Sequence, residues 1–180
     1  MPQLEPFTLA RLPSPIGTML AVSDGEGALR GLDFEDLASR MTLLLRRQYG
    51  HEVALREGAA PAAVRRALAD YFAGALTALD GLAVATAGTP FQRAVWAALR
   101  QIPVGTTLSY GALAERIGRK AAVRAVGAAN GANPIGVVVP CHRVIGADHS
   151  LTGYGGGLER KRWLLAHEGA LPKRLAAAAA

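Results

Sequence analysis

The sequence has very few groups that could form covalent or metal cross-links. Cys141 is the single cysteine among 180 residues, so no intrachain disulfide can form, and a zinc site built on several thiolates is excluded. The four histidines show no pair at metal-ligand spacing in the first half of the chain. We therefore expect no metal and no cofactor.

Two kinds of apolar segment are also missing. No window approaches 18 consecutive apolar residues, so a membrane-spanning helix is not expected, and Met1 to Leu20 lacks the basic start and apolar stretch of a secretory signal. Hydrophobic residues still make up 51% of the chain, enough to bury a sizeable core. We expect a cytoplasmic protein with one ordinary domain or two small ones and no membrane partner.

Acidic residues are scarce in the second half only. Residues 1–88 carry 8 basic and 10 acidic side chains, whereas residues 89–180 carry 12 basic and 4 acidic ones. This asymmetry indicates that the second half meets a polyanion, although a solvated basic surface has the same composition. Arginine accounts for 17 of the 20 basic residues, which suits bidentate phosphate contacts but also follows from GC-rich coding.

The first half has the pattern of a small α+β domain. Partly alternating segments separated by turn signals predict three strands of an antiparallel sheet, at 7–12, 18–22 and 28–34. Two predicted helices follow, near 37–49 and 61–72.

The predicted domain boundary lies near Gly88. Residues 74–88 read as a loop with some extended structure. The division is therefore into an N-terminal domain, 1–88, a C-terminal domain, 89–170, and a flexible tail, 171–180.

The second half opens with helices that have clear start and stop signals. Pro90 follows a good N-cap residue, and Val95, Leu99 and Ile102 share the apolar face of the first helix with Phe91. Ser109 caps a second helix that stops at Gly118. A third helix over 121–130 follows a short basic turn, which is the helix-turn-helix arrangement.

This third helix consists almost entirely of alanine, glycine and valine. Gly127 costs about 1 kcal/mol there relative to alanine. Such a residue is expected where the backbone approaches something closely, either another helix or the walls of a DNA groove. Arg124 is the one long cationic side chain of the helix.

Cys141 lies in a context that favours reactivity. It follows an apolar run, 135–139, that we predict to be a buried strand, and it stands between Pro140 and His142. A nucleophilic cysteine must be a thiolate, which nearby histidine or arginine stabilises. An isolated cysteine is more often an inert small hydrophobe, so the surrounding residues decide.

Pro140-Cys141-His142-Arg143-Val144 resembles the active-site motif of the O6-alkylguanine-DNA alkyltransferases, the methylated-DNA–protein-cysteine methyltransferases. The likeness runs in family order from Thr89 to Gly169. It includes Ser109-Tyr110, Arg124 to Gly127, Asn130 to Pro134, Thr152 to Gly157 and Trp163 to Gly169. The front half matches more loosely, through Ser14 to Gly17 and Tyr71 to Gly74. The small single-protein members of bacteria and archaea are the most similar.

The resemblance implies an α+β fold of two parts. The N-terminal part is a ribonuclease H-like domain with a small antiparallel sheet and helices, and the C-terminal part is a winged-helix-like domain with the helix-turn-helix. It further implies a monomer that binds double-stranded DNA carrying O6-alkylguanine and that can cluster along DNA.

The implied reaction is a single-turnover alkyl transfer. Cys141 accepts the alkyl group of O6-alkylguanine, and of O4-alkylthymine. The thioether product is stable, so each protein molecule reacts once and is consumed. His142 acts through a water as the base for Cys141, and Glu168 orients His142, which is the general form of an activated nucleophile. His142 reaches Cys141 only if the chain turns at Pro140. Taken alone, His142 and Glu168 would be read as surface residues.

Further roles follow from the same resemblance. Tyr110 donates to N3 of the leaving guanine and presses on the neighbouring phosphate, and Asn133 ties the recognition helix to the active-site turn. Arg124 replaces the target base when it flips out through the minor groove, and the small residues Ala125 and Gly127 let the helix enter that groove. The base-binding residues implied are Val144, Tyr154, Gly155 and Gly156.

Two departures and two alternatives accompany this interpretation. Val123 stands where many relatives have alanine, and Gly155 stands where some have serine. The zinc ligands of some eukaryotic members and the sensor domain of the bacterial adaptive-response protein have no counterpart. A thiol hydrolase also uses Cys, His and Glu, but it would turn over. A non-catalytic alkyltransferase-like DNA-binding module lacks the acceptor cysteine.

Overall fold

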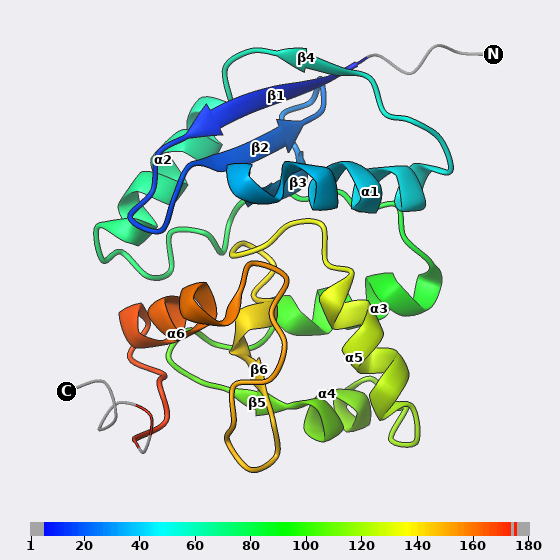
Figure 1. Cartoon of the computed structure of the whole chain (residues 1–180), viewed down its shortest axis with the longest axis vertical. Coiled ribbons are helices and arrows are strands. Elements are labelled where there is room, and N and C mark those ends of the chain that lie inside the picture. Colours follow the sequence, from blue (N-terminus) through cyan, green and yellow to red (C-terminus); the bar gives the residue numbers. More distant parts are fainter. Residues whose placement is uncertain (1–5, 174, 176–180) are drawn as a thin grey trace. The chain divides into compact units, whose positions relative to one another are not determined.

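The computed structural model describes residues 6–173 and Leu175, which form two compact units (Figure 1). The first unit runs to Thr89 and includes Pro134–Val138. The second unit runs from Pro90 to Asn133 and resumes at Val139. Most of the tail predicted at 171–180 lies outside the described residues, and the boundary near residue 88 stays a prediction.

The predicted α+β class and its antiparallel sheet are confirmed. The strands β1 (Phe7–Leu12), β2 (Met19–Ser23) and β3 (Leu29–Phe34) pair antiparallel in sequence order. A short strand that the sequence did not indicate, β4 (Leu55–Glu57), pairs parallel with β1 and gives the order β3-β2-β1-β4. With three residues and mostly exposed side chains, β4 has no apolar alternation to detect.

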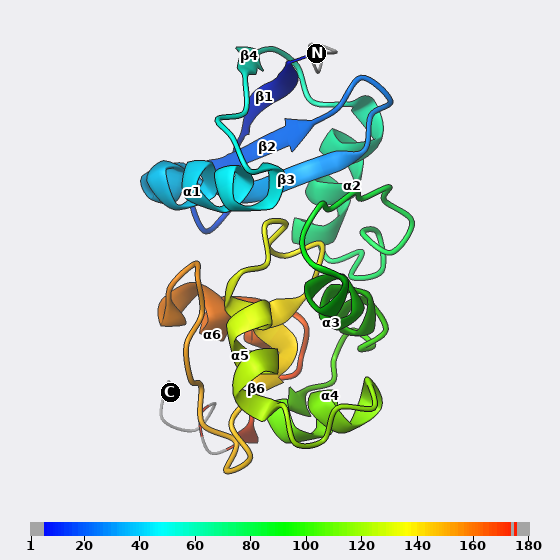
Figure 2. The ribbon, with the colours of Figure 1, turned by 90° about the vertical axis from the view of Figure 1, so that its right-hand side faces the viewer.

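Helices cover both faces of this sheet. A 3-10 turn, η1 (Glu35–Leu37), leads into α1 (Ala38–Tyr49), and α2 (Ala62–Phe72) lies on the opposite side of the sheet (Figure 2). Every residue of β2 is buried, as expected for a central strand covered on both faces. The two predicted helices are confirmed to within a residue or two of their bounds.

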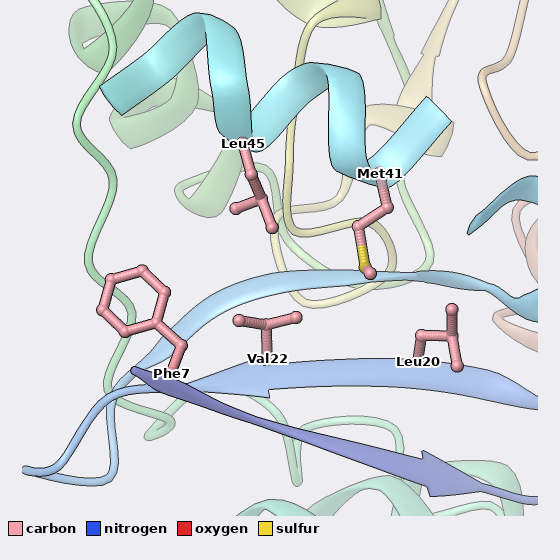
Figure 3. Packing of buried hydrophobic residues seen from close by; sticks show 5 residues of the cluster. All are labelled: Phe7, Leu20, Val22, Met41 and Leu45. Atoms are coloured by element: carbon pink, nitrogen blue, oxygen red, sulfur yellow. The ribbon is translucent and has the colours of Figure 1, made fainter. Parts of the chain in front are cut away.

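One half of this core is visible between α1 and the sheet. Leu20 and Val22 of β2 point toward Met41 and Leu45 of α1, and Phe7 of β1 closes the end of the cluster (Figure 3). Full burial of each such side chain contributes roughly 1.5–3 kcal/mol.

The open edge of β3 is covered by two later segments. Leu29 pairs with Val84, and Leu32 pairs with Ile135 through hydrogen bonds to Pro134 and from Gly136, both 2.9 Å. Both bridges are parallel. They satisfy backbone groups that would otherwise invite another chain to add a strand.

The predicted strand over 135–139 is wrong. Only Ile135 makes a bridge, and residues 136–138 form a turn in which Val137 has a φ of 68°. Ile135 and residues 137–139 are buried, and a short apolar run does not distinguish a buried strand from a buried turn. A β-branched residue rarely adopts a positive φ, so the turn is held by its surroundings.

The second unit consists of short helices around a two-stranded parallel ribbon. The helices are α3 (Pro90–Arg100), α4 (Tyr110–Arg116), α5 (Val123–Gly131) and α6 (Leu158–His167). The ribbon pairs β5 (Leu108–Ser109) with β6 (Val144–Ile145), and the 3-10 turn η2 (Cys141–Arg143) precedes β6. Among the described residues, no helix has the length and apolar character needed to span a membrane.

The predicted start and stop signals of the second helix, Ser109 and Gly118, are confirmed. Ser109 Oγ accepts a hydrogen bond from the Ala112 N–H (3.1 Å) at the start of α4, and Gly118 has a φ of 70° just after its end. Trp96 Nε1 donates to the Ala129 carbonyl (2.8 Å), which ties α3 to α5. Helices α4 and α5 with their short connection form the predicted helix-turn-helix.

Candidate active site around Cys141

Cys141 begins the tight turn η2, in which the next residue, His142, is buried in the protein. The Cys141 N–H donates to Val139 O (2.8 Å), and the Arg143 N–H donates to Pro140 O (3.0 Å). The turn required for His142 to act beside Cys141 is therefore present. The Cys141 side chain is largely buried, as part of the wall of a cavity.

His142 is completely buried and paired on one side only. Its Nε2 lies 2.8 Å from Glu168 Oε1, whereas its Nδ1 has no hydrogen-bond partner among the described residues. The carboxylate requires a proton on Nε2, which leaves the lone pair on Nδ1. Burial lowers the pKa of His142; Glu168 opposes this, and the charges of Arg143 and Lys161 add to it. A neutral imidazole with a free acceptor nitrogen is suited to act as a base.

Arg143 holds Glu168 by a two-point contact. Its Nε donates to Glu168 Oε2 (2.9 Å), its Nη2 donates to Oε1 (3.0 Å), and its Nη1 donates to the Ile102 carbonyl (2.7 Å). Burial raises the pKa of Glu168, but His142 and Arg143 outweigh burial and bring the pKa to about 2. The surface readings of His142 and Glu168 are thus wrong, because both side chains are buried.

A cavity of about 290 Å³ lies beside Cys141. Besides Cys141, its lining residues are Tyr110, Gly127, Asn130, Gly131, Gly153, Tyr154 and Gly155. Two of the four predicted base-binding residues are therefore in the lining. The other two, Val144 and Gly156, are buried and outside it.

The Tyr110 hydroxyl stays protonated and is positioned to donate a hydrogen bond. Burial raises the pKa of Tyr110, the Thr152 hydrogen bond opposes this, and Cys141 adds to the rise. The hydroxyl donates to the Thr152 carbonyl (3.3 Å), and the ring lies against Gly127, where a Cβ atom would come within 3.8 Å. Tyr110 therefore spans from α5 to the glycine-rich loop across the cavity.

Of the remaining predicted site residues, Asn133 is buried, whereas Arg124 and Ala125 are exposed. Asn133 is buried, and its Nδ2 donates to Val139 O (2.7 Å), joining the end of α5 to the turn before Cys141. Arg124 and Ala125 are exposed on α5 and do not line the cavity. Val123, which departs from the family pattern, is 39% exposed beside them.

Sequence reasoning missed Lys161, a fully buried lysine of α6. Its Nζ donates to the carbonyls of Val144 (2.6 Å), Thr152 (2.9 Å) and Gly153 (3.2 Å), so it ties β6 to the glycine-rich loop. Burial lowers the pKa of Lys161 to about 8, and Cys141 opposes that change. The available signal was periodicity, because Lys161 lies on the buried face of α6 with Leu164 and Leu165.

The described residues contain no group of three or more His, Cys, Asp or Glu side chains that could hold a metal ion. The arrangement instead contains a cysteine at a cavity wall, a neutral histidine with a free nitrogen, and a carboxylate that fixes the histidine. This set can ionise a thiol beside a bound molecule.

Comparisons with known proteins agree with this geometry. The family described as "6-O-methylguanine DNA methyltransferase, DNA binding domain" matches residues 90–170. A methylated-DNA–protein-cysteine methyltransferase of Salmonella typhimurium is 53% identical over 162 residues, covering 89% of this chain and 95% of the relative. One from Haemophilus influenzae is 43% identical, covering 85% of this chain and 81% of the relative. The crystal structure of Mycobacterium tuberculosis OGT in complex with DNA matches with a TM-score of 0.77 and 40% identity, covering 93% of this chain and 97% of that chain.

Proposed function

The chain belongs to the methylated-DNA–protein-cysteine methyltransferases, DNA-repair enzymes with a DNA-binding domain, and on that premise we propose that Cys141 is the alkyl acceptor. The Cys141 thiolate attacks the alkyl carbon in line with the bond to guanine O6. The S–C bond forms, the C–O6 bond breaks, and its electron pair leaves with the guanine. The thioether is stable, so each molecule reacts once.

The protons move through the groups around the cavity. The Cys141 thiol loses its proton through a water to His142 Nδ1, and Glu168 stabilises the imidazolium that forms. Tyr110 donates a hydrogen bond to N3 of the departing guanine, which lowers the barrier for a poor leaving group. The guanine anion then takes up, through water, the proton that His142 received. The observation that carries this proposal is the free Nδ1 of a buried histidine, held by Glu168, next to the single cysteine.

Access to a base inside duplex DNA requires the base to flip out. We assign this step to the exposed face of α5, where Arg124 fills the gap in the stack and Ala125 and Gly127 allow close approach in the minor groove. The protein acts as a monomer that can cluster on DNA, and O4-alkylthymine is a second substrate. Action on chromosomal DNA fits the cytoplasmic location expected from the sequence.

The direct experiment mixes the protein with a duplex containing O6-methylguanine and maps the adduct by mass spectrometry. We expect one methyl group per molecule, on Cys141, and no transfer by Cys141→Ala, which should still bind DNA. Repeated turnover, hydrolysis of an ester substrate, or an adduct elsewhere would contradict the proposal.

A second experiment separates base flipping from chemistry. Arg124→Ala should strongly slow repair of duplex DNA and slow reaction with a free O6-substituted guanine base much less, because the free base has no stack to leave. Tyr110→Phe should slow both reactions. Arg119→Ala, which removes an exposed cation before α5, is the matched control for charge. If Arg124→Ala slows both substrates equally, its flipping role is wrong.

A further inference from the structure

A strained turn lies just ahead of Cys141 in the chain. The Val138 N–H donates to the Gly136 carbonyl (2.8 Å), and Val137 between them has a φ of 68°, so these residues form a γ-turn of the rare positive-φ type. A β-branched side chain makes that backbone conformation still less favourable, whereas glycine adopts it freely. A valine at this position therefore requires an explanation beyond local preference.

A second tight turn follows at once. The Cys141 N–H donates to the Val139 carbonyl (2.8 Å), and Pro140 between them has a φ of −82° and a ψ of 64°, close to the angles of the common inverse γ-turn. The proline ring restricts φ to values near this one. Asn133 Nδ2 donates to the same Val139 carbonyl (2.7 Å) and so fixes the chain between the two turns.

On the other side of Val137, β3 fixes the chain. The Leu32 N–H donates to the Pro134 carbonyl, and the Gly136 N–H donates to the Leu32 carbonyl, both at 2.9 Å. The Val137 side chain is only 1% exposed, so its packing adds to these hydrogen bonds. The backbone is thus held before and after Val137, and the positive φ is the conformation that joins the two fixed points.

We propose that Val137 is a positioning residue whose left-handed backbone, held by β3 and Asn133, directs the Cys141 sulfur at the cavity before the substrate arrives. This inference rests on the proposed function, because it requires Cys141 to attack a base bound beside it. Displacement of a reacting atom by about 1 Å can slow a reaction on the order of a hundredfold. A turn fixed in advance keeps the sulfur in line with the alkyl carbon, whereas a relaxed turn would misdirect it.

Two substitutions at Val137 separate the backbone conformation from the packing of the side chain. Val137→Ala removes packing, and a positive φ remains unfavourable for alanine. Val137→Gly removes more of the side chain but adopts the positive φ without strain. Val138→Ala and Val138→Gly are the matched controls, because Val138 is also buried and has no positive φ.

Each protein is tested in two reactions of Cys141. The first is methylation by a saturating duplex containing O6-methylguanine, measured as a single-turnover rate constant, so that molecules that fail to fold lower the amplitude and not the rate. The second is alkylation by iodoacetamide, a small reagent that needs no alignment with a bound base. Positioning affects the first reaction and leaves the second unchanged.

We expect Val137→Ala to slow methylation about tenfold, equivalent to about 1.4 kcal/mol of barrier, and Val137→Gly to restore the rate to within about threefold of the unmodified protein. The iodoacetamide rate should be the same in all five proteins, and the Val138 variants should show no recovery from alanine to glycine.

Three results would overturn the inference: an unchanged methylation rate in Val137→Ala, a slower rate in Val137→Gly than in Val137→Ala, or equal changes in the two reactions. The second result would mean that only side-chain packing matters. If the unmodified protein reacts with iodoacetamide but is not methylated by the duplex, the proposed function itself has failed.

Discussion

Arg11 and Arg143 make nearly the same contacts in two different environments. Arg11 donates to Glu35 (2.8 Å) and Glu57 (2.7 Å) on the surface of the first unit, and all three side chains are about half exposed or more. Arg143 donates to Glu168 at 2.9 Å and 3.0 Å, and these side chains are 7% and 0% exposed. Distance alone does not distinguish the two clusters.

Burial gives the second cluster its effect. Water screens the Arg11 cluster, so each of its pairs contributes little to stability. In the Arg143 cluster, removal of one partner leaves the other as a buried charge without compensation. Because His142 shares the same carboxylate, the buried cluster also sets the protonation state of a group next to Cys141. An ion pair from which water is excluded therefore acts on a neighbouring titratable group, whereas a solvated pair does not.

The largest effect is expected from Glu168→Gln. The change leaves the Arg143 charge buried and removes the partner that fixes His142, so we expect a loss of about 3–5 kcal/mol in unfolding free energy. Cys141 methylation should slow by two orders of magnitude or more, comparable with loss of a general base. Denaturant unfolding and single-turnover rates measure the two effects. A loss below 1 kcal/mol would place the buried cluster in the same class as the exposed one.

Acid should destabilise the protein through the buried cluster. His142 has a lowered pKa, so below its ordinary value of about 6.5 the unfolded chain binds a proton that the folded chain does not, and stability falls. Glu168 has a pKa of about 2, so the stability that it contributes above its ordinary pKa is lost as the pH falls toward 2, on the order of 3 kcal/mol.

Unfolding free energies measured from pH 8 to pH 3 check this prediction. Glu168→Gln should flatten the lower part of the curve. A curve for this variant that stays parallel to that of the unmodified protein would contradict the assignment.

A smaller effect is expected from Lys161→Met. The variant removes a positive charge that interacts with Cys141, together with three hydrogen bonds to backbone carbonyls around the cavity. We expect methylation of Cys141 to slow about tenfold at pH 7, or roughly 1.4 kcal/mol of barrier, with a smaller loss at higher pH, where the thiol ionises more readily. Lys120→Met, which removes an exposed lysine near Glu115, is the control and should leave the rate unchanged.

The smallest effect belongs to the exposed cluster. Glu57→Gln should lower the unfolding free energy only slightly, because the Arg11–Glu57 pair is solvated. The difference should disappear at 1 M salt, where screening acts over about 3 Å. Thermal unfolding at low and high salt measures it, and a salt-independent loss would show that this pair behaves like the buried one.

Much of the fold was predictable because its signals are local. The strands of the antiparallel sheet follow one another along the chain and are joined by short turns. The cap at Ser109 and the stop at Gly118 depend on residues within a few positions of each other. The turn at 135–139 was misread because only Ile135 finds a strand partner, and that partner is Leu32, far away in the sequence.

Some residues of the candidate site could be predicted from a local motif and others could not. Cys141 and His142 are adjacent, so a motif contains both, whereas Glu168 entered only through the resemblance. Lys161 was missed because lysine as a residue type does not indicate burial. Its environment depends on β6 and the glycine-rich loop, whose backbone carbonyls accept its hydrogen bonds.

The bridge between Leu32 and Ile135 has a consequence for how the protein is made. As the chain leaves the ribosome, β1, β2 and β3 emerge early, but the segment that covers one end of the β3 edge emerges after about half of the second unit. The roughly 45 residues between Thr89 and Pro134 take on the order of seconds to synthesise. During that interval part of the sheet edge is open to other nascent chains, and the same late segment that closes it leads directly into Cys141. Completion of the first unit and placement of the cysteine are therefore late events in one growing chain, and a chain that stops before Ile135 lacks both.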